Sequence, residues 1–108
     1  MNEQEAFDKM VTHLRKQGIR SEREDQLCLL RSNGLKCAIG ALITDEEYEP
    51  KMENLPLHDL VPVVPVLGAL LYEFLWDMRE VHDNTPPESW EQGFEEVAAN
   101  YGLEYTAP

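Results

Sequence analysis

The fold is decided by residues 27–39, whose sequence is LCLLRSNGLKCAI. Two short apolar runs flank Asn33 and Gly34, and this dipeptide is the strongest short-range hairpin signal because both residues tolerate positive φ. We therefore expect antiparallel strands near residues 26–31 and 35–39. The apolar stretch 38–43 either continues the second strand or turns into a short buried helix, since periodicity does not distinguish the two.

A helix is expected before the hairpin. Asn2 and Glu5 have the spacing of a capping box, in which each side chain bonds the backbone N–H of the other residue. Gly18 is the expected helix end. Between these signals, apolar residues recur at helical spacing: Ala6, Phe7, Met10, Val11 and Leu14.

A short helical turn and a long helix are expected after the hairpin. Thr44 and Glu47 form a second capping-box pair that opens a brief helical turn, which Pro50 ends. Pro65 stands where a first helical residue belongs, and a core helix over residues 66–82 is predicted to follow it.

A last helix is expected near the C-terminus. Thr85 and Glu88 form a third capping-box pair, and Gly102 is the expected helix end. One face of this helix carries apolar residues at helical spacing: Trp90, Phe94, Val97 and Tyr101. We assign Trp76 to the core together with Trp90.

These elements predict an α+β fold in which a small antiparallel β-hairpin packs with three main α-helices. Two strands alone are barely stable, so the helices must supply the core on which the hairpin lies. A chain of 108 residues suits one domain. We place this domain at residues 1–103 and a C-terminal tail at residues 104–108.

The charge of the chain is strongly acidic and unevenly spread. Nine Lys and Arg against 21 Asp and Glu give a net charge of −12. Residues 1–51 hold eight basic and ten acidic side chains, a net of −2, whereas residues 52–108 hold one and eleven, a net of −10. Such a field repels nucleic acid and anionic lipid, so we expect no direct nucleic-acid binding and no membrane binding. The first twenty residues lack the apolar run of a signal peptide, which predicts a cytoplasmic location.

Acidic side chains recur on the last two predicted helices. Three of them fall on one face of the long helix, and four follow on the next: Glu73, Asp77 and Glu80, then Glu88, Glu91, Glu95 and Glu96. Together they are our candidate binding surface, which would imitate a nucleic-acid backbone toward a basic partner. The alternative is that these carboxylates form a solvated face that keeps the protein soluble. A divalent cation would need further oxygen ligands held in a rigid cage, so no metal is expected here.

The two cysteines, Cys28 and Cys37, lie on either side of the predicted turn. With Asn33 and Gly34 at its centre, the cysteines are diagonal neighbours about 7–8 Å apart, too far for a disulfide. Only one of three turn registers would place them opposite each other. Buried free thiols are therefore the main expectation. The scattered histidines do not provide zinc-ligand spacing, and no cofactor is expected.

An enzymatic alternative pairs Cys37 with His82. If the chain becomes helical after Cys37, the thiol would sit at a helix N-terminus beside Lys36, where its pKa falls. Against this pair, Asp83 projects about 100° away from His82 on a helix and is not expected to orient the imidazole ring.

The block at residues 33–48, NGLKCAIGALITDEEY, resembles small uncharacterised proteins encoded by bacteriophages and prophages. The features that carry the resemblance are Cys28, Cys37, the pair His82-Asp83 and Trp90, whereas residues 54–66 depart from the pattern. The resemblance implies a viral gene product in the cytoplasm of a bacterial host. Small accessory phage proteins often bind and modulate a host protein.

The leading functional prediction is therefore a non-enzymatic protein-binding module. Its partner would be a bacterial protein with a basic surface, which an acidic face attracts electrostatically. The thiol-dependent activity of Cys37 with His82 is the alternative, and self-association into a homo-oligomer stays open.

Overall fold

A computed structural model describes residues 1–22 and 28–108 of the chain. This part holds five α-helices and a two-stranded antiparallel sheet, which is an α+β fold. The helices are α1 (Glu3–Gln17), α2 (Leu57–Leu60), α3 (Pro65–Gly68), α4 (Tyr72–Asn84) and α5 (Trp90–Tyr101). The strands are β1 (Arg31–Ser32) and β2 (Leu35–Lys36), and the 3₁₀ helices are η1 (Gly40–Leu42), η2 (Pro50–Asn54), η3 (Val61–Val63) and η4 (Pro87–Ser89). The class is as predicted, but two short helices join the three main ones.

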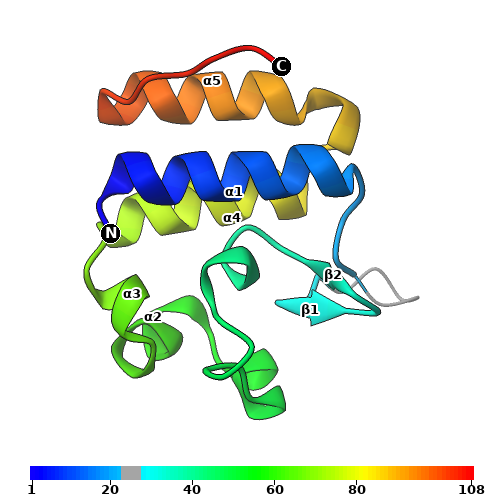
Figure 1. Cartoon of the computed structure of the whole chain (residues 1–108), viewed down its shortest axis with the longest axis vertical. Coiled ribbons are helices and arrows are strands. Elements are labelled where there is room, and N and C mark those ends of the chain that lie inside the picture. The colour runs from blue at the N-terminus through cyan, green and yellow to red at the C-terminus, as the bar shows by residue number, and fades with distance from the viewer. Residues whose placement is uncertain (23–27) are drawn as a thin grey trace.

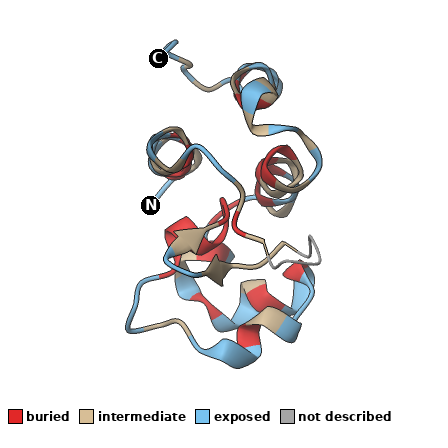
Figure 2. Ribbon diagram, turned by 90° about the vertical axis from the view of Figure 1, so that its right-hand side faces the viewer, coloured by how far each residue is buried: buried red, intermediate tan, exposed pale blue. Residues whose placement is uncertain are grey.

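The three long helices α1, α4 and α5 lie beside one another, and the hairpin and the short helices cover one side of this group (Figure 1). Viewed along the helices, their buried residues face inward (Figure 2). The largest fully buried side chains come from the three helices, the segment after β2 and the short helices, among them Met10, Ile39, Leu60, Phe74 and Phe94. In the described residues, no helix has the length and apolar character needed to cross a membrane.

Helix α1 forms as its sequence predicts. The side chain of Asn2 accepts a hydrogen bond from the N–H of Glu5 at 2.9 Å, and the N–H of Asn2 donates to Oε1 of Glu5 at 3.0 Å. Gly18 ends the helix in the left-handed conformation, with φ of 75°. The five predicted apolar residues are all buried.

The hairpin has the predicted turn but shorter strands. Asn33 and Gly34 adopt positive φ values of 51° and 83°, and Arg31 pairs with Lys36. Part of the expected first strand, residues 26 and 27, lies outside the described residues. The second strand ends early because the chain turns into the buried helix η1. Gly40 permits this turn, since a Cβ there would lie 2.1 Å from the carbonyl oxygen of Leu30.

The predicted helix over residues 66–82 is divided in two, because the chain breaks between α3 and α4. Pro65 begins α3 as predicted, and α4 contains the second part of the predicted range. Gly68 ends α3, and Leu71 is extended, with φ of −63° and ψ of 129°. The N–H of Leu71 donates to Oε2 of Glu3 at 2.9 Å, so a contact with α1 stabilises the break. The intervening turn buries Leu70.

The third predicted capping box, Thr85 with Glu88, is wrong. Neither η4 nor α5 has a side-chain cap, and α5 begins only at Trp90. Thr85 instead follows α4 as an extended residue, and its carbonyl accepts a hydrogen bond from Nε1 of Trp90 at 3.0 Å. The carbonyl bond anchors the start of α5 where a side-chain cap was expected.

Candidate functional site

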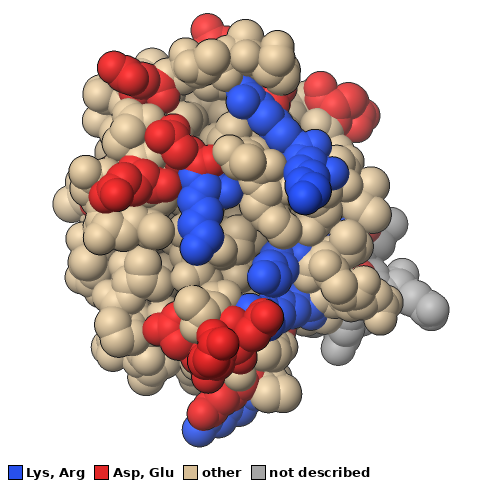
Figure 3. Space-filling model, in the orientation of Figure 1, with Lys and Arg blue, Asp and Glu red and all other residues tan. Residues whose placement is uncertain are grey.

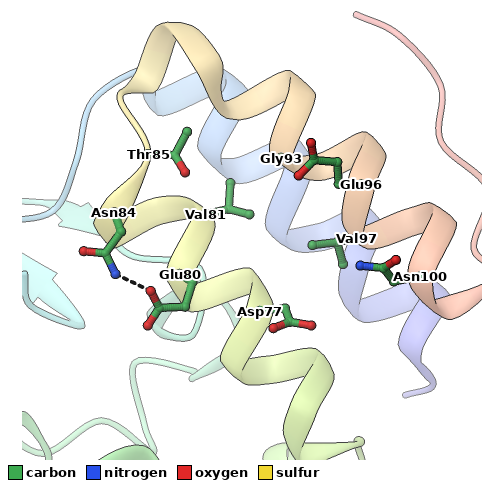
Figure 4. A pocket seen from close by; sticks show the side chains of 9 residues that line it. All are labelled: Asp77, Glu80, Val81, Asn84, Thr85, Gly93, Glu96, Val97 and Asn100. Atoms are coloured by element: carbon green, nitrogen blue, oxygen red, sulfur yellow. Dashed lines mark hydrogen bonds between the residues drawn. The ribbon is translucent and has the colours of Figure 1, made fainter.

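Three of the seven predicted acidic residues surround one groove between α4 and α5. Asp77 and Glu80 come from α4, and Glu96 comes from α5. The groove has a volume of about 360 Å³, and these carboxylates are arranged around it (Figure 4). We call it the acidic groove, and its other lining residues are Val81, Asn84, Thr85, Gly93, Val97 and Asn100.

The shape of the acidic groove depends on Gly93. A Cβ at this position would lie 2.9 Å from Cγ1 of Val81, so only glycine lets α5 approach α4 this closely. Gly93 is not among the residues that the sequence predicts for the site. A glycine inside an otherwise helical pattern is the signal that points to such a close contact.

Hydrogen bonds fix two of the groove carboxylates. Oδ2 of Asp77 accepts from the hydroxyl of Tyr101 at 2.7 Å. Burial, and then this bond to Asp77, raise the pKa of Tyr101 to about 12. Glu80 accepts a hydrogen bond from the side-chain amide of Asn84. A hydroxyl and an amide are uncharged, so these bonds do not neutralise the two carboxylates. Nη2 of Arg79 lies 3.8 Å from Oε1 of Glu80 and offsets part of the negative charge at that end of the groove.

The other four acidic residues lie outside the groove lining. Glu91 faces α1, where Oε2 and Oε1 accept hydrogen bonds from Nε and Nη2 of Arg15 at 2.8 and 2.7 Å. This pairing with Arg15 lowers the pKa of Glu91. Glu73, Glu88 and Glu95 are exposed. The predicted surface is therefore divided, and Glu91 joins two helices.

The segment expected to be a tail packs back on α1. The N–H of Glu104 donates to Oε1 of Gln4 at 2.8 Å, and Nη2 of Arg15 donates to the carbonyl of Thr106 at 2.7 Å. The hydroxyl of Tyr105 donates to Oε1 of Glu91 at 2.8 Å. Arg15 therefore contacts both α5 and the C-terminal segment.

His82 is fully buried and bonded at both ring nitrogens. Nδ1 lies 2.6 Å from Oδ1 of Asp83, and Nε2 lies 3.0 Å from the backbone nitrogen of Ser21. Because the N–H of Ser21 can only donate, Nε2 accepts and Nδ1 carries the proton. The expectation that Asp83 would not orient the ring is wrong, since the carboxylate reaches sideways to its neighbour at the end of α4. Stacking on Trp90, with ring centres 5.6 Å apart, also holds the imidazole.

Cys37 does not have the low pKa that a nucleophile needs. Its Sγ accepts a hydrogen bond from the N–H of Gly40 at 3.3 Å, but burial outweighs this bond and raises the thiol pKa to about 12. The expected fall of the pKa at a helix N-terminus is therefore contradicted. Nε2 of His82 accepts from Ser21, which leaves no free basic nitrogen on the imidazole ring for the thiol.

Cys28 approaches the pair His82 and Asp83. One ligand atom from each of the three residues lies within 4.8 Å of the others, a spacing that could hold a metal ion. The bonding of His82 fits a metal poorly, because Nδ1 carries a proton and Nε2 faces an N–H donor. Burial and then Asp83 raise the pKa of Cys28 to about 11, which disfavours the thiolate that a metal requires.

The two cysteines are free. The observed register places Asn33 and Gly34 at the centre of the turn, as predicted, but the pairing does not extend to Cys28, which instead forms an isolated antiparallel bridge with Glu22. Both line a cavity of about 90 Å³ together with Asp83. The cluster of Cys28, His82 and Asp83 is thus best explained as a junction that holds residues 20–21 and 28 against the end of α4.

Comparisons of the chain with protein-family models, curated proteins and solved structures give no match.

Proposed function

We propose that the protein is a non-enzymatic protein-binding module whose acidic groove receives a basic surface of its partner. The observation that carries this proposal is the gathering of Asp77, Glu80 and Glu96 around one groove of about 360 Å³. This groove belongs to residues 52–108, whose net charge is −10. Arg79 is the one Lys or Arg of that part of the sequence, and its guanidinium stacks on Trp76 while Nη2 lies 3.8 Å from Oε1 of Glu80, so one positive charge stands against three groove carboxylates.

The distribution of charge over the molecule supports an oriented encounter. On the face formed by α1 and the hairpin, Lys and Arg side chains lie among Asp and Glu side chains (Figure 3), and Arg31 pairs with Asp45 at 2.7 Å. The acidic groove opens on the other side, because α1 lies behind α4 and α5 in the view of Figure 4. The Lys and Arg side chains of the α1 face reduce its attraction for a basic partner, so the acidic groove is the more favourable approach, which raises the rate of productive encounter.

The biological setting that we propose is the cytoplasm of a bacterium. The resemblance of residues 33–48 to phage and prophage proteins supports an accessory factor that modulates a host protein. In this role the carboxylates of the acidic groove imitate the phosphates of a nucleic acid. Binding to nucleic acid or anionic lipid is disfavoured by the same charge.

The proposal is tested by reversing charge inside and outside the groove. The variant Glu80→Lys with Glu96→Lys changes the groove, and the matched control Glu88→Lys with Glu95→Lys makes the same charge change on exposed residues outside it. Each protein is used to capture partners from a bacterial lysate at low and moderate salt. We expect wild type to retain a partner that moderate salt releases, since exposed charge pairs are screened.

The two charge variants should behave differently. The groove variant should lose the partner, whereas the control should retain most of it. Equal loss in both variants would show that net charge alone is responsible, and equal retention would exclude the groove as the binding surface.

A further inference from the structure

Trp76 is exposed on α4, contrary to its expected place in the core. It has 40% of its surface accessible, whereas Trp90 has 3%. An open pocket of about 440 Å³ lies beside it, lined by Tyr72, Glu73, Trp76 and Asp77. The pocket therefore combines two aromatic rings with two carboxylates.

This pocket continues the acidic groove, because Asp77 lines both. Oδ2 of Asp77 is bonded to Tyr101, and Glu73 is exposed. The centres of the Tyr72 and Trp76 rings are 6.3 Å apart, and the two ring planes are tilted by 32° relative to each other. A flat cation that enters the pocket meets aromatic surface and negative charge together.

Resting on the proposed function, we infer that this pocket receives an arginine side chain of the partner protein. A guanidinium is planar, stacks on aromatic rings and bonds carboxylates through a fixed fork of donors, whereas an ammonium does not stack in this way. The Trp76 ring already carries one guanidinium, since Cζ of Arg79 lies 4.2 Å from its centre. Arg79 does not line the pocket, so the partner's arginine would use the aromatic surface that Trp76 and Tyr72 present to the pocket. An apolar side chain would fit less well, because it would remove Glu73 and Asp77 from water without a counter-charge.

The probes are a capped oligoarginine peptide and the oligolysine peptide of the same length. Binding is measured at low salt by the indole N–H signals of the two tryptophans in an NMR titration, with Trp76→Phe used to assign the signals. Oligoarginine should bind wild type about 3- to 30-fold more tightly than oligolysine, the range that a cation–aromatic contact supplies. The signal of Trp76 should move more than the signal of buried Trp90.

Variants separate the pocket from the charge of the molecule. Trp76→Ala should abolish the preference for arginine, and Trp76→Phe should retain part of it. The matched control is Val63→Ala, which truncates another exposed apolar side chain outside the pocket, and it should leave the preference unchanged. An arginine preference that survives Trp76→Ala, or an unmoved Trp76 signal, would overturn the inference.

The same peptides distinguish this inference from the proposed function. Suppose that Glu80→Lys with Glu96→Lys weakens the binding of both peptides, while Trp76→Ala changes the binding of neither. The arginine pocket is then wrong, and the acidic groove is supported. Suppose instead that the groove variant changes the binding of neither peptide, while Trp76→Ala removes the preference for arginine. The arginine pocket is then supported, and the groove is wrong. If neither variant has an effect, both are wrong.

Discussion

Single residues explain why the cysteine and histidine cluster is a structural junction. His82 accepts from the N–H of Ser21 and donates to Asp83, and its carbonyl accepts from Nε of Arg20 at 3.0 Å. These bonds join the chain after α1 to the end of α4. A buried histidine with both nitrogens bonded is unable to exchange protons with a substrate without breaking this junction.

Burial of Cys37 predicts a loss of stability in alkali. The thiol has an ordinary pKa of 9.0, and burial raises the folded value to about 12. Between these values the unfolded chain releases a proton that the folded chain keeps, so the free energy of unfolding falls as the pH rises. Urea unfolding should show a decline that sets in near pH 9 and continues toward pH 12, and this decline should be smaller in Cys37→Ala. If the free energy of unfolding declined equally in Cys37→Ala, the buried Cys37 thiol would not be the cause.

Elements show where local sequence signals suffice and where they fail. Helix α1 and the hairpin turn were predicted correctly because their determinants lie within three or four residues of one another. The break before α4 was missed because it depends on Glu3, which is 68 residues from Leu71 in sequence. The exposure of Trp76 was missed for the same reason, because it depends on how α4 packs against distant parts of the chain.

The candidate site was predictable only in part, for a related reason. The i, i+4 and i+7 spacing correctly placed Asp77 and Glu80 on a common side of α4. Spacing along α5 did not reveal that Glu91 turns toward Arg15 while Glu96 turns toward α4, because this depends on how α5 packs against both helices. The aromatic pocket was missed because Trp76 was assigned to the core.

The contact between α4 and α5 can be tested at Gly93. In Gly93→Ala, the new methyl group would lie 2.9 Å from Cγ1 of Val81 and force the helices apart. Such overpacking costs about 1–3 kcal/mol of unfolding free energy, measured by urea unfolding. Gly68→Ala is the control, because its nearest neighbour is 3.6 Å away, and it should be neutral or slightly stabilising. Equal stability of the two variants would contradict the close approach of α4 and α5.

At the scale of the whole molecule, acidic side chains are not confined to the groove. The α1 and hairpin face carries Asp and Glu among its Lys and Arg side chains (Figure 3), and the other side carries the acidic groove (Figure 4). Another acidic segment lies around residues 45–49, at some distance along the chain from the groove. If net charge alone attracted a basic partner, this segment would compete with the groove for it.

The most direct test of the acidic groove is therefore a map of where a basic ligand binds. Backbone amide signals are followed by NMR while oligolysine is added at low salt. We expect the largest shifts to cluster around Asp77, Glu80 and Glu96, and added salt to reverse them. Largest shifts at residues 45–49, or small shifts spread evenly over the surface, would contradict a binding site between α4 and α5.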